Sequence, residues 1–165
     1  MARSGYVARI REKIGTDPLM LQAVSVFVFD RENRFLLAQQ NGHDNWVTIG
    51  GAIEIGETPA DAAVRECWEE TGMLVRPTRV LGVFGGSGLK FTYGNGDVVF
   101  YTGIGFAAEI ISGEPKPDGA ELRRLEWVSR DQLESLPMMP AMRDLIRLCI
   151  GGGPEAAFQP ATWKP

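Results

Sequence analysis

One short stretch of the chain, residues 51–73, carries an arginine and several glutamates at orderly spacing: Arg65, with Glu57, Glu66, Glu69 and Glu70. Carboxylates repel one another, so a fold that gathers them on one surface usually does so around cations. Oxygen ligands with no neighbouring histidine or cysteine cluster favour Mg²⁺ or Mn²⁺ over Zn²⁺. Because magnesium commonly binds substrate phosphate oxygens together with a few carboxylates, the stretch predicts chemistry on a phosphate ester or phosphoanhydride.

The element that must position these side chains is a helix over residues 59–71. Thr58 can cap its first turn, and Pro59 suits the first helical position, where no N–H partner is needed. Asp61 favours the positive end of the helix dipole. Gly72 suits the left-handed conformation that commonly ends a helix. The helix should therefore begin and end within this stretch.

The same helix is expected to be amphipathic. At about 100° per residue, one stripe of small and apolar residues should face the core: Ala60, Ala63, Val64, Cys67 and Thr71. Glu66, Glu69 and Glu70 fall together on another face. Arg65 can pair with Glu69 at i,i+4 or reach back to Glu57 in the preceding loop. One face should pack on a core while the other offers carboxylates to cations.

This spacing resembles the Nudix box, G-x5-E-x7-R-E-U-x-E-E-x-G-U with U apolar, and every defined position is met. The matching residues are Gly51, Glu57, Arg65, Glu66, Cys67, Glu69, Glu70, Gly72 and Met73. Beyond the box, the resemblance covers the chain only by the order of its expected elements. It implies an α/β fold, a Nudix-type α/β/α sandwich around a mixed β-sheet. It also implies hydrolysis of a pyrophosphate linkage with two to three Mg²⁺ (or Mn²⁺) ions.

The resemblance implies roles for individual residues. The metal ligands would be the Gly50 carbonyl, Glu66, Glu69, Glu70 and a loop acid, Glu121. Glu121 would complete the metal site or act as general base, and Glu114 and Asp118 are its rivals in the same loop. Glu57 and Arg65 would hold the loop and the helix in register, and both count with the catalytic set. Simple solvation remains an alternative for a lone loop glutamate such as Glu121.

Substrate-binding candidates lie outside the box. Six aromatic residues could stack on a base: Phe27, Trp46, Phe84, Phe91, Tyr93 and Tyr101. Aromatic residues in strands are more often core residues, so each has that alternative. Arg34 could steer phosphates, with ordinary surface charge as its alternative. His43, the only histidine, lies in a polar loop and is expected to be exposed.

The family implies a small-molecule nucleotide substrate, and two enzyme hypotheses compete. One is hydrolysis of ADP-ribose or another nucleotide sugar to two monophosphates. The other is a sanitising enzyme that cuts (d)NTPs to monophosphate and pyrophosphate. A proline common in ADP-ribose enzymes about fifteen residues past the box is absent here, where Gly88 and Leu89 stand, which weakens the first hypothesis. A catalytically silent nucleotide-binding module is a third, although such domains commonly lose box carboxylates and this chain keeps them.

Composition is typical of one globular enzyme domain. The chain has 165 residues and a net charge of −4, which argues against a stable nucleic-acid or anionic-membrane surface. No apolar run approaches the ~20 residues that cross a bilayer, and the start has no apolar signal core, so a cytoplasmic protein is expected. Cys67 and Cys149 are expected as reduced core residues.

We expect one Nudix domain over residues 1–153 with a short N-terminal helix, and an irregular tail over 154–165 that could serve a homodimer.

Hydrophobic pattern and turn signals predict the remaining elements. Strands are expected at 22–29, 34–39, 46–49, 74–84, 90–93, 98–111 and 126–128, and helices at 6–14, 129–136 and 140–150. Strands mixed with a few helices favour a sheet covered by helices.

Overall fold

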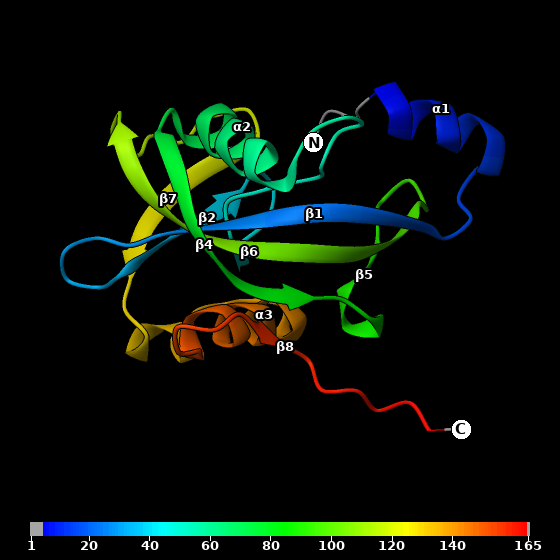
Figure 1. Ribbon diagram of the computed structural model, residues 1–165. Coiled ribbons are helices and arrows are strands. Elements are labelled where there is room, and N and C mark those ends of the chain that lie inside the picture. The colour runs from blue at the N-terminus through cyan, green and yellow to red at the C-terminus, as the bar shows by residue number, and fades with distance from the viewer. Residues whose placement is uncertain (1–4, 165) are drawn as a thin grey trace.

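A computed structural model describes residues 5–164 of the chain (Figure 1). Its helices are α1 (Gly5–Ile14), α2 (Pro59–Thr71) and α3 (Pro140–Gly151), with 3-10 turns η1 (Ser87–Leu89) and η2 (Asp131–Ser135). Its strands are β1 (Leu19–Val28), β2 (Phe35–Gln40), β3 (Trp46–Val47), β4 (Leu74–Phe84), β5 (Lys90–Thr92), β6 (Val98–Ser112), β7 (Leu122–Val128) and β8 (Ala157–Phe158).

The strands form two sheets. The larger has the order β1-β6-β4-β8, and β5 pairs with the first residues of β6, Val98 to Phe100. It is mixed, because β6 runs parallel to β1 and antiparallel to β4. The smaller sheet, β3-β2-β7, is antiparallel, and single bridges from Val26 to Ile49 and from Ala23 to Ala52 tie the segment after β3 to β1. Helices α2 and α3 lie on opposite sides of these strands, so the expected α/β architecture is confirmed (Figure 1).

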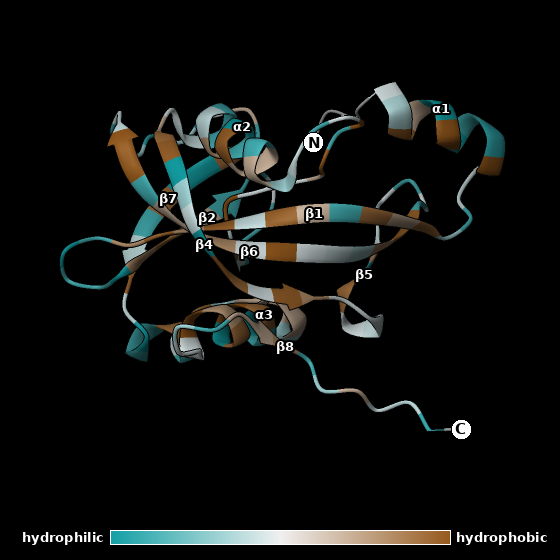
Figure 2. Ribbon diagram, viewed as in Figure 1, coloured by the Kyte–Doolittle hydropathy of each residue, from teal (hydrophilic) through white to brown (hydrophobic). Residues whose placement is uncertain are grey.

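Two apolar clusters hold the layers together. Alternate residues of β1 point to opposite faces, so Val26 and Val28 pack towards α2 while Phe27 packs towards α3. The apolar stretches of the central strands lie between the two helices (Figure 2). Burying each large side chain such as Phe27 or Phe35 contributes roughly 1.5–3 kcal/mol. The sandwich is thus stabilised on both faces of β1.

Three of the candidate stacking residues, Phe27, Trp46 and Phe84, belong to this core, and only Phe84 of them also lines a cavity. Phe27 has no exposed surface and Trp46 only 3%. Both lie in the cluster under α3, and the Trp46 ring is also covered by the Arg124 guanidinium at 5.2 Å. Stacking on a substrate base needs an open ring face, so the expectation for these two residues is corrected to a core role.

Both cysteines are free and buried, as expected. Cys67 packs under α2 and Cys149 under α3, in different clusters. Burial raises the pKa of the Cys67 thiol to about 11 and that of the Cys149 thiol to about 12. They therefore act as small apolar core residues.

Several expected elements need correction. The strand expected at 126–128 begins at Leu122, because β7 pairs along the whole of β2. The helix expected at 129–136 is only the short turn η2. The tail, expected to be irregular, adds β8 to the edge of β4, with Ala157 opposite Gly82. A Cβ on Gly82 would lie 2.9 Å from the Ala157 oxygen, so this glycine permits the added strand. The division at residue 153 itself stays a prediction.

Within the part of the chain that the structure describes, no helix is both long enough and apolar enough to cross a bilayer.

Candidate active site

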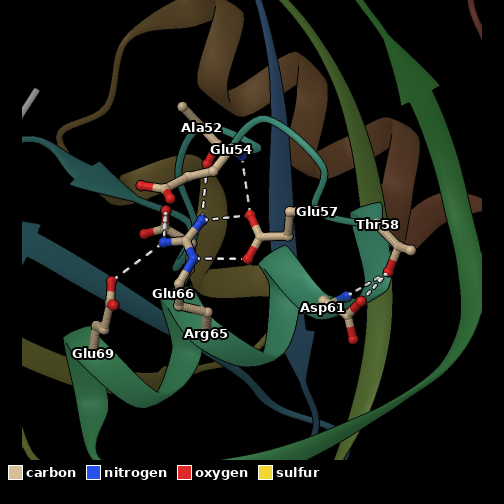
Figure 3. A network of polar contacts seen from close by, with 8 residues as sticks. All are labelled: Ala52, Glu54, Glu57, Thr58, Asp61, Arg65, Glu66 and Glu69. Atoms are coloured by element: carbon tan, nitrogen blue, oxygen red, sulfur yellow. Dashed lines mark hydrogen bonds and ion pairs between the residues drawn. The ribbon is translucent and has the colours of Figure 1, made fainter. Parts of the chain in front are cut away.

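Helix α2 begins and ends as the sequence predicts. The backbone N–H of Asp61 donates to Thr58 Oγ1 at 3.1 Å, and the Thr58 hydroxyl donates to the Asp61 carboxylate at 2.6 Å (Figure 3). Gly72 has φ of 70° and donates its N–H to the Trp68 carbonyl at 2.9 Å. These local caps hold the helix at fixed bounds, Pro59–Thr71, so its glutamates keep their register against the loop before it.

The face of α2 that is buried differs from the expected stripe. Its buried residues are Ala62, Ala63, Cys67, Glu70 and Thr71. Ala60, expected in the core, is exposed. The helix is rotated about its axis so that Glu70 turns inwards, with 5% exposure, while the Glu69 side chain stays 58% exposed. The three glutamates therefore do not share one solvent face, and Glu70 lies at the boundary of the core.

Arg65 is the centre of the polar network in Figure 3. Its Nε and Nη2 donate to the two carboxylate oxygens of Glu57 at 2.8 and 2.9 Å. Its Nη1 donates to Glu66 at 2.7 Å and to Glu69 at 3.2 Å, and Nη2 also donates to the Ala52 carbonyl at 3.0 Å. The Arg65 hydrogen bonds lower the pKa of Glu57, and Glu57 in turn raises the pKa of Arg65. One planar guanidinium thus ties the loop to the helix.

The glycine turn before the helix accommodates two of the glutamates. The backbone N–H of Gly50 donates to Glu70 Oε2 at 2.9 Å. Gly50 has φ of 136°, and a Cβ there would lie 2.2 Å from the Val24 carbonyl oxygen. A Cβ on Gly51 would lie 2.6–2.7 Å from the Glu66 carboxylate atoms. The missing side chains therefore allow the turn to approach β1 and leave space for the Glu66 carboxylate.

The carboxylates around this turn interact electrostatically. Burial raises the pKa of Glu70 to about 8, the Gly50 N–H opposes the rise, and the charges of Glu66, Glu121 and Asp118 add to it. Burial also raises the pKa of Glu66, Arg65 opposes it, and Glu69 and Glu121 add to it. Glu121 therefore acts on both helix glutamates, although it lies about fifty residues further along the chain.

The loop before β7 holds Glu121 beside α2. The N–H groups of Lys116 and Asp118 donate to the carbonyls of Thr71 and Glu70 at 3.0 and 3.1 Å. The Asp118 carboxylate accepts from the backbone N–H groups of Glu121 and Leu122, at 3.0 and 2.7 Å. Asp118 thus stabilises the turn itself, and Glu114 is exposed. Of the three rival acids, only Glu121 lines the cavities beside the helix.

The donor set fits a hard divalent cation. Within residues 5–164 no three His, Cys, Asp or Glu side chains form a ready metal cage. Arg65 contacts one oxygen each of Glu66 and Glu69. Half-buried Glu66 and buried Glu70 supply oxygen donors only, and burial raises the pKa of both carboxyl groups. Such a site suits Mg²⁺, which binds through few carboxylates and completes its shell with water and substrate phosphate oxygens.

Two adjoining cavities flank the carboxylates. One, of about 660 Å³, lies between α1, the loop at Ala52 and α2, and the other, of about 380 Å³, lies over β1 and α3. Tyr93 lines both cavities, and Phe84 lines the smaller one despite only 5% exposure. Arg34 lies elsewhere, bonded to Asp30 at 2.6 Å in a separate hollow, so the phosphate-steering role is not supported by its position. His43 is exposed, as expected, at the edge of the smaller cavity.

Sequence reasoning missed three residues at these cavities. Arg11 comes from α1, and Ser25 and Thr48 come from β1 and the segment after β3. Arg11 looks like one charge among several on a surface helix, and Ser25 and Thr48 look like polar interruptions in apolar runs. The signal in the sequence that could have singled out Ser25 and Thr48 is a polar residue within an apolar run expected to form a strand, since such a residue is seldom buried without a reason.

A family model described as the NUDIX domain matches residues 20–149. The chain belongs to the Nudix hydrolase family. A relative named uncharacterized Nudix hydrolase YvcI, from Bacillus subtilis (strain 168), is 30% identical over 134 residues, 80% of this chain and 81% of that protein. NudC, an NAD-capped RNA hydrolase of Haemophilus influenzae (strain PittEE), is 30% identical over 140 residues, 82% of this chain. This Nudix hydrolase spans 48% of the length of that NudC.

Solved structures share the fold of this Nudix hydrolase. A UDP-X diphosphatase superposes with a TM-score of 0.67 at 22% identity, covering 96% of this chain and 75% of that chain. An ADP-ribose pyrophosphatase from Streptococcus suis 89-1591 gives 0.63 at 20% identity, covering 84% and 98%. A MutT protein from Methanosarcina mazei Go1 gives 0.63 at 23% identity, covering 80% and 94%. These structures confirm the fold, and the family model and the YvcI relative confirm the hydrolase class. Nudix hydrolases generally use divalent metal ions and act on small nucleotide substrates.

Replacing Arg65 with lysine should lower turnover of this Nudix hydrolase about 10- to 100-fold, as loss of a group that orients metal ligands commonly does. An ammonium group cannot reproduce the paired bonds to Glu57 together with those to Glu66 and Ala52. Stability should fall by about 1–3 kcal/mol, because partly buried carboxylates lose their partner. Turnover and urea unfolding measure the two effects. The control is Arg76→Lys, whose pair with Glu109 is exposed and whose loss should cost within about 0.5 kcal/mol. Equal behaviour of the two variants would contradict the role of Arg65.

The pH dependence of stability should reveal Glu70 in the metal-free protein. Its folded pKa of about 8 exceeds the ordinary 4.5, so its contribution to stability is complete below about pH 4.5 and is lost as the pH rises towards 8. The melting temperature in EDTA should fall over that window more steeply than in Glu70→Gln. Added Mg²⁺ should raise the wild-type melting temperature more at pH 8 than at pH 5. Parallel pH profiles of the two proteins in EDTA would rule out this account of Glu70.

Proposed function

We propose that this Nudix hydrolase cleaves the pyrophosphate linkage of a two-part nucleoside diphosphate derivative, such as a nucleotide sugar, to two monophosphates. The observation that carries the proposal is that Glu121 lines both cavities and Glu66 lines the larger one, while the charges of both act on the buried Glu70. A diphosphate that lies against these carboxylates can extend a different organic group into each cavity.

The proposed metal ligands are the Gly50 carbonyl, Glu66, Glu70 and Glu121, holding two to three Mg²⁺ (or Mn²⁺) ions, with Glu69 at the exposed edge. Such ions, when bound, lower the pKa of a water molecule and neutralise charge on the phosphoryl oxygens. Glu121 faces both cavities and is the proposed general base that accepts the proton of the attacking water. Arg65 orients Glu66, and the Gly50 N–H orients Glu70. The protein therefore contributes positioning and charge.

The names of the relatives support a two-part substrate. They refer to ADP-ribose, to UDP-X and to NAD-capped RNA. ADP-ribose and NAD each join two organic groups through a diphosphate. The MutT likeness supports the alternative, a (d)NTP-sanitising enzyme. A nucleoside triphosphate, however, carries only one organic group, the nucleoside, so one of the two cavities would hold no organic group. A silent binding module is opposed by the complete set of box carboxylates.

A substrate panel tests the proposal. The full-length protein is incubated with Mg²⁺ and nucleotide sugars, dinucleoside polyphosphates or (d)NTPs, and both products are identified. The expected result is two monophosphates from a nucleotide sugar, abolished by EDTA. Monophosphate and pyrophosphate from (d)NTPs alone would favour the sanitising enzyme. No turnover of any compound would favour the silent module.

A further inference from the structure

We propose that the Tyr93–Tyr101 pair divides the substrate recess into a base chamber and a sugar chamber. This inference rests on the proposed function and assigns each half of the substrate to one cavity. The base chamber is the cavity of about 380 Å³, whose lining includes Ser25, Thr48, Phe84, Phe91, Met142 and Leu145. The sugar chamber is the cavity of about 660 Å³, whose lining includes Arg11, Glu54, Arg65, Glu66, Asn95 and Asp97.

The partition follows from which residues the cavities share. Tyr93, Tyr101 and Glu121 line both, and among residues 5–164 no other residue does. The two tyrosine hydroxyls lie 2.7 Å apart and are hydrogen-bonded. Phe91 packs edge-on against the Tyr101 ring, with ring centres 5.6 Å apart and planes at 76°. The hydrogen bond and the Phe91 contact thus fix the positions of the two tyrosine rings between the cavities. A diphosphate bound beside Glu121 would have the base chamber on one side of the tyrosine pair and the sugar chamber on the other.

The base chamber suits a flat heterocycle. Most of its walls are apolar, and its buried polar side chains include Ser25 and Thr48, at 6% and 8% exposure, whose hydroxyl oxygens lie 3.0 Å apart. Each hydroxyl can donate or accept, so the pair can meet the polar edge of a base while the apolar walls cover its faces. A sugar carries a hydroxyl on almost every carbon and would leave several of them unpaired against these walls.

The sugar chamber is more polar than the base chamber. Charged and amide side chains from α1, the box loop and the β5–β6 hairpin line it, together with apolar residues such as Leu21 and Val99. Arg11 donates to the carbonyls of Gly15, Asp17 and Val98 and lies 3.6 Å from the Asp97 carboxylate, so it fixes α1 as one wall. Glu54 is exposed there and offers carboxylate oxygens that accept hydrogen bonds from hydroxyl groups. A polyhydroxylated group finds partners on several sides.

The test measures binding of each half separately. Calorimetry in Mg²⁺ compares AMP and UMP with ribose 5-phosphate and glucose 1-phosphate. The double variant Ser25→Ala/Thr48→Val, which removes both hydroxyls together, should weaken the nucleoside monophosphates about 3- to 10-fold and leave the sugar phosphates within about twofold. Glu54→Gln should do the reverse. Thr102→Val, an exposed threonine of β6 outside both chambers, is the matched control and should change neither.

Failure of this inference differs from failure of the proposed function. If the wild type hydrolyses nucleotide sugars but each variant affects both product classes equally, or neither, the two-chamber assignment is wrong while the proposed function holds. If the wild type hydrolyses no two-part diphosphate, the proposed function is wrong. Melting temperatures within a few degrees of wild type show that the variants remain folded.

Discussion

Replacing Glu70 with glutamine should lower turnover by at least about 100-fold without unfolding the protein. Glu70 is 5% exposed, and its oxygen accepts the Gly50 N–H at 2.9 Å. A glutamine amide can still accept that bond through its oxygen, so the turn and the helix keep their geometry. The charge that would hold a divalent cation is lost, and metal stabilisation of phosphoryl charge is worth several kcal/mol, with each 1.4 kcal/mol a factor of ten in rate. Steady-state turnover and thermal unfolding in Mg²⁺ measure the two effects.

The control for this substitution is Glu109→Gln. Glu109 is 61% exposed and pairs only with Arg76 on the surface, so its turnover should equal that of the wild type. The metal-free melting temperature of Glu70→Gln at pH 8 should equal or exceed that of the wild type, because a buried charge has been removed. Full activity of Glu70→Gln would remove Glu70 from the metal site.

Alanine at the two glycines of the turn before α2, Gly50 and Gly51, should separate stability from catalysis. Gly50→Ala places a Cβ 2.2 Å from the Val24 carbonyl, at a φ of 136° that L residues rarely adopt, so stability should fall by about 3 kcal/mol or more. For Gly51→Ala, the three atoms nearest to the added Cβ all belong to the far end of the Glu66 side chain, at 2.6–2.7 Å, so the stability loss should stay within about 1 kcal/mol. The displaced Glu66 carboxylate should nevertheless lower turnover about 100-fold, because a shift of about 1 Å at a catalytic group can cost that much.

Gly56→Ala and Gly153→Ala are the references for these substitutions. A Cβ at either position meets nothing within 4 Å, but Gly56 has φ of 83° and Gly153 has no such backbone restriction. Gly56→Ala therefore reports the cost of backbone strain alone, and Gly153→Ala reports neither strain nor clash. Chemical denaturation and turnover of all four variants form one series. Equal stability of the Gly50 and Gly51 variants would show that the approach of the turn to β1 is not tight.

Local signals predicted part of the site well. The bounds of α2 were predicted because its caps, Thr58 and Gly72, act within one turn of the chain. The Arg65 pairs with Glu57 and Glu69 were predicted because both partners lie within helix or loop reach. The α/β class followed from strands alternating with few helices. These features depend on residues that are near one another in sequence.

Features that depend on packing between distant segments were missed. The rotation of α2 that buries Glu70 and exposes Ala60 is decided by contact with β1 and β4. Phe27 and Trp46 are core residues because the α3 side of the sandwich covers them. Arg34 lies away from the site because it follows the C-terminal end of β1. The two cavities lie instead against the earlier part of that strand, at Leu21, Ala23 and Ser25. The β8 strand exists because β4 has a free edge, which composition of the tail does not reveal.

The amino-acid sequence by itself determined which groups this protein can offer to a substrate. They are a helix with several glutamates, an arginine that bonds them to the preceding loop, and a glycine turn, a combination suited to a cation and a diphosphate. Capping and i,i+4 pairing act over a few residues, so the chain encodes them directly. The tertiary structure decided which glutamate is buried, that Glu121 joins the group, and where the two chambers lie. Those outcomes depend on close packing of surfaces far apart in the chain, which fixes side-chain rotation and distance only once the layers have assembled.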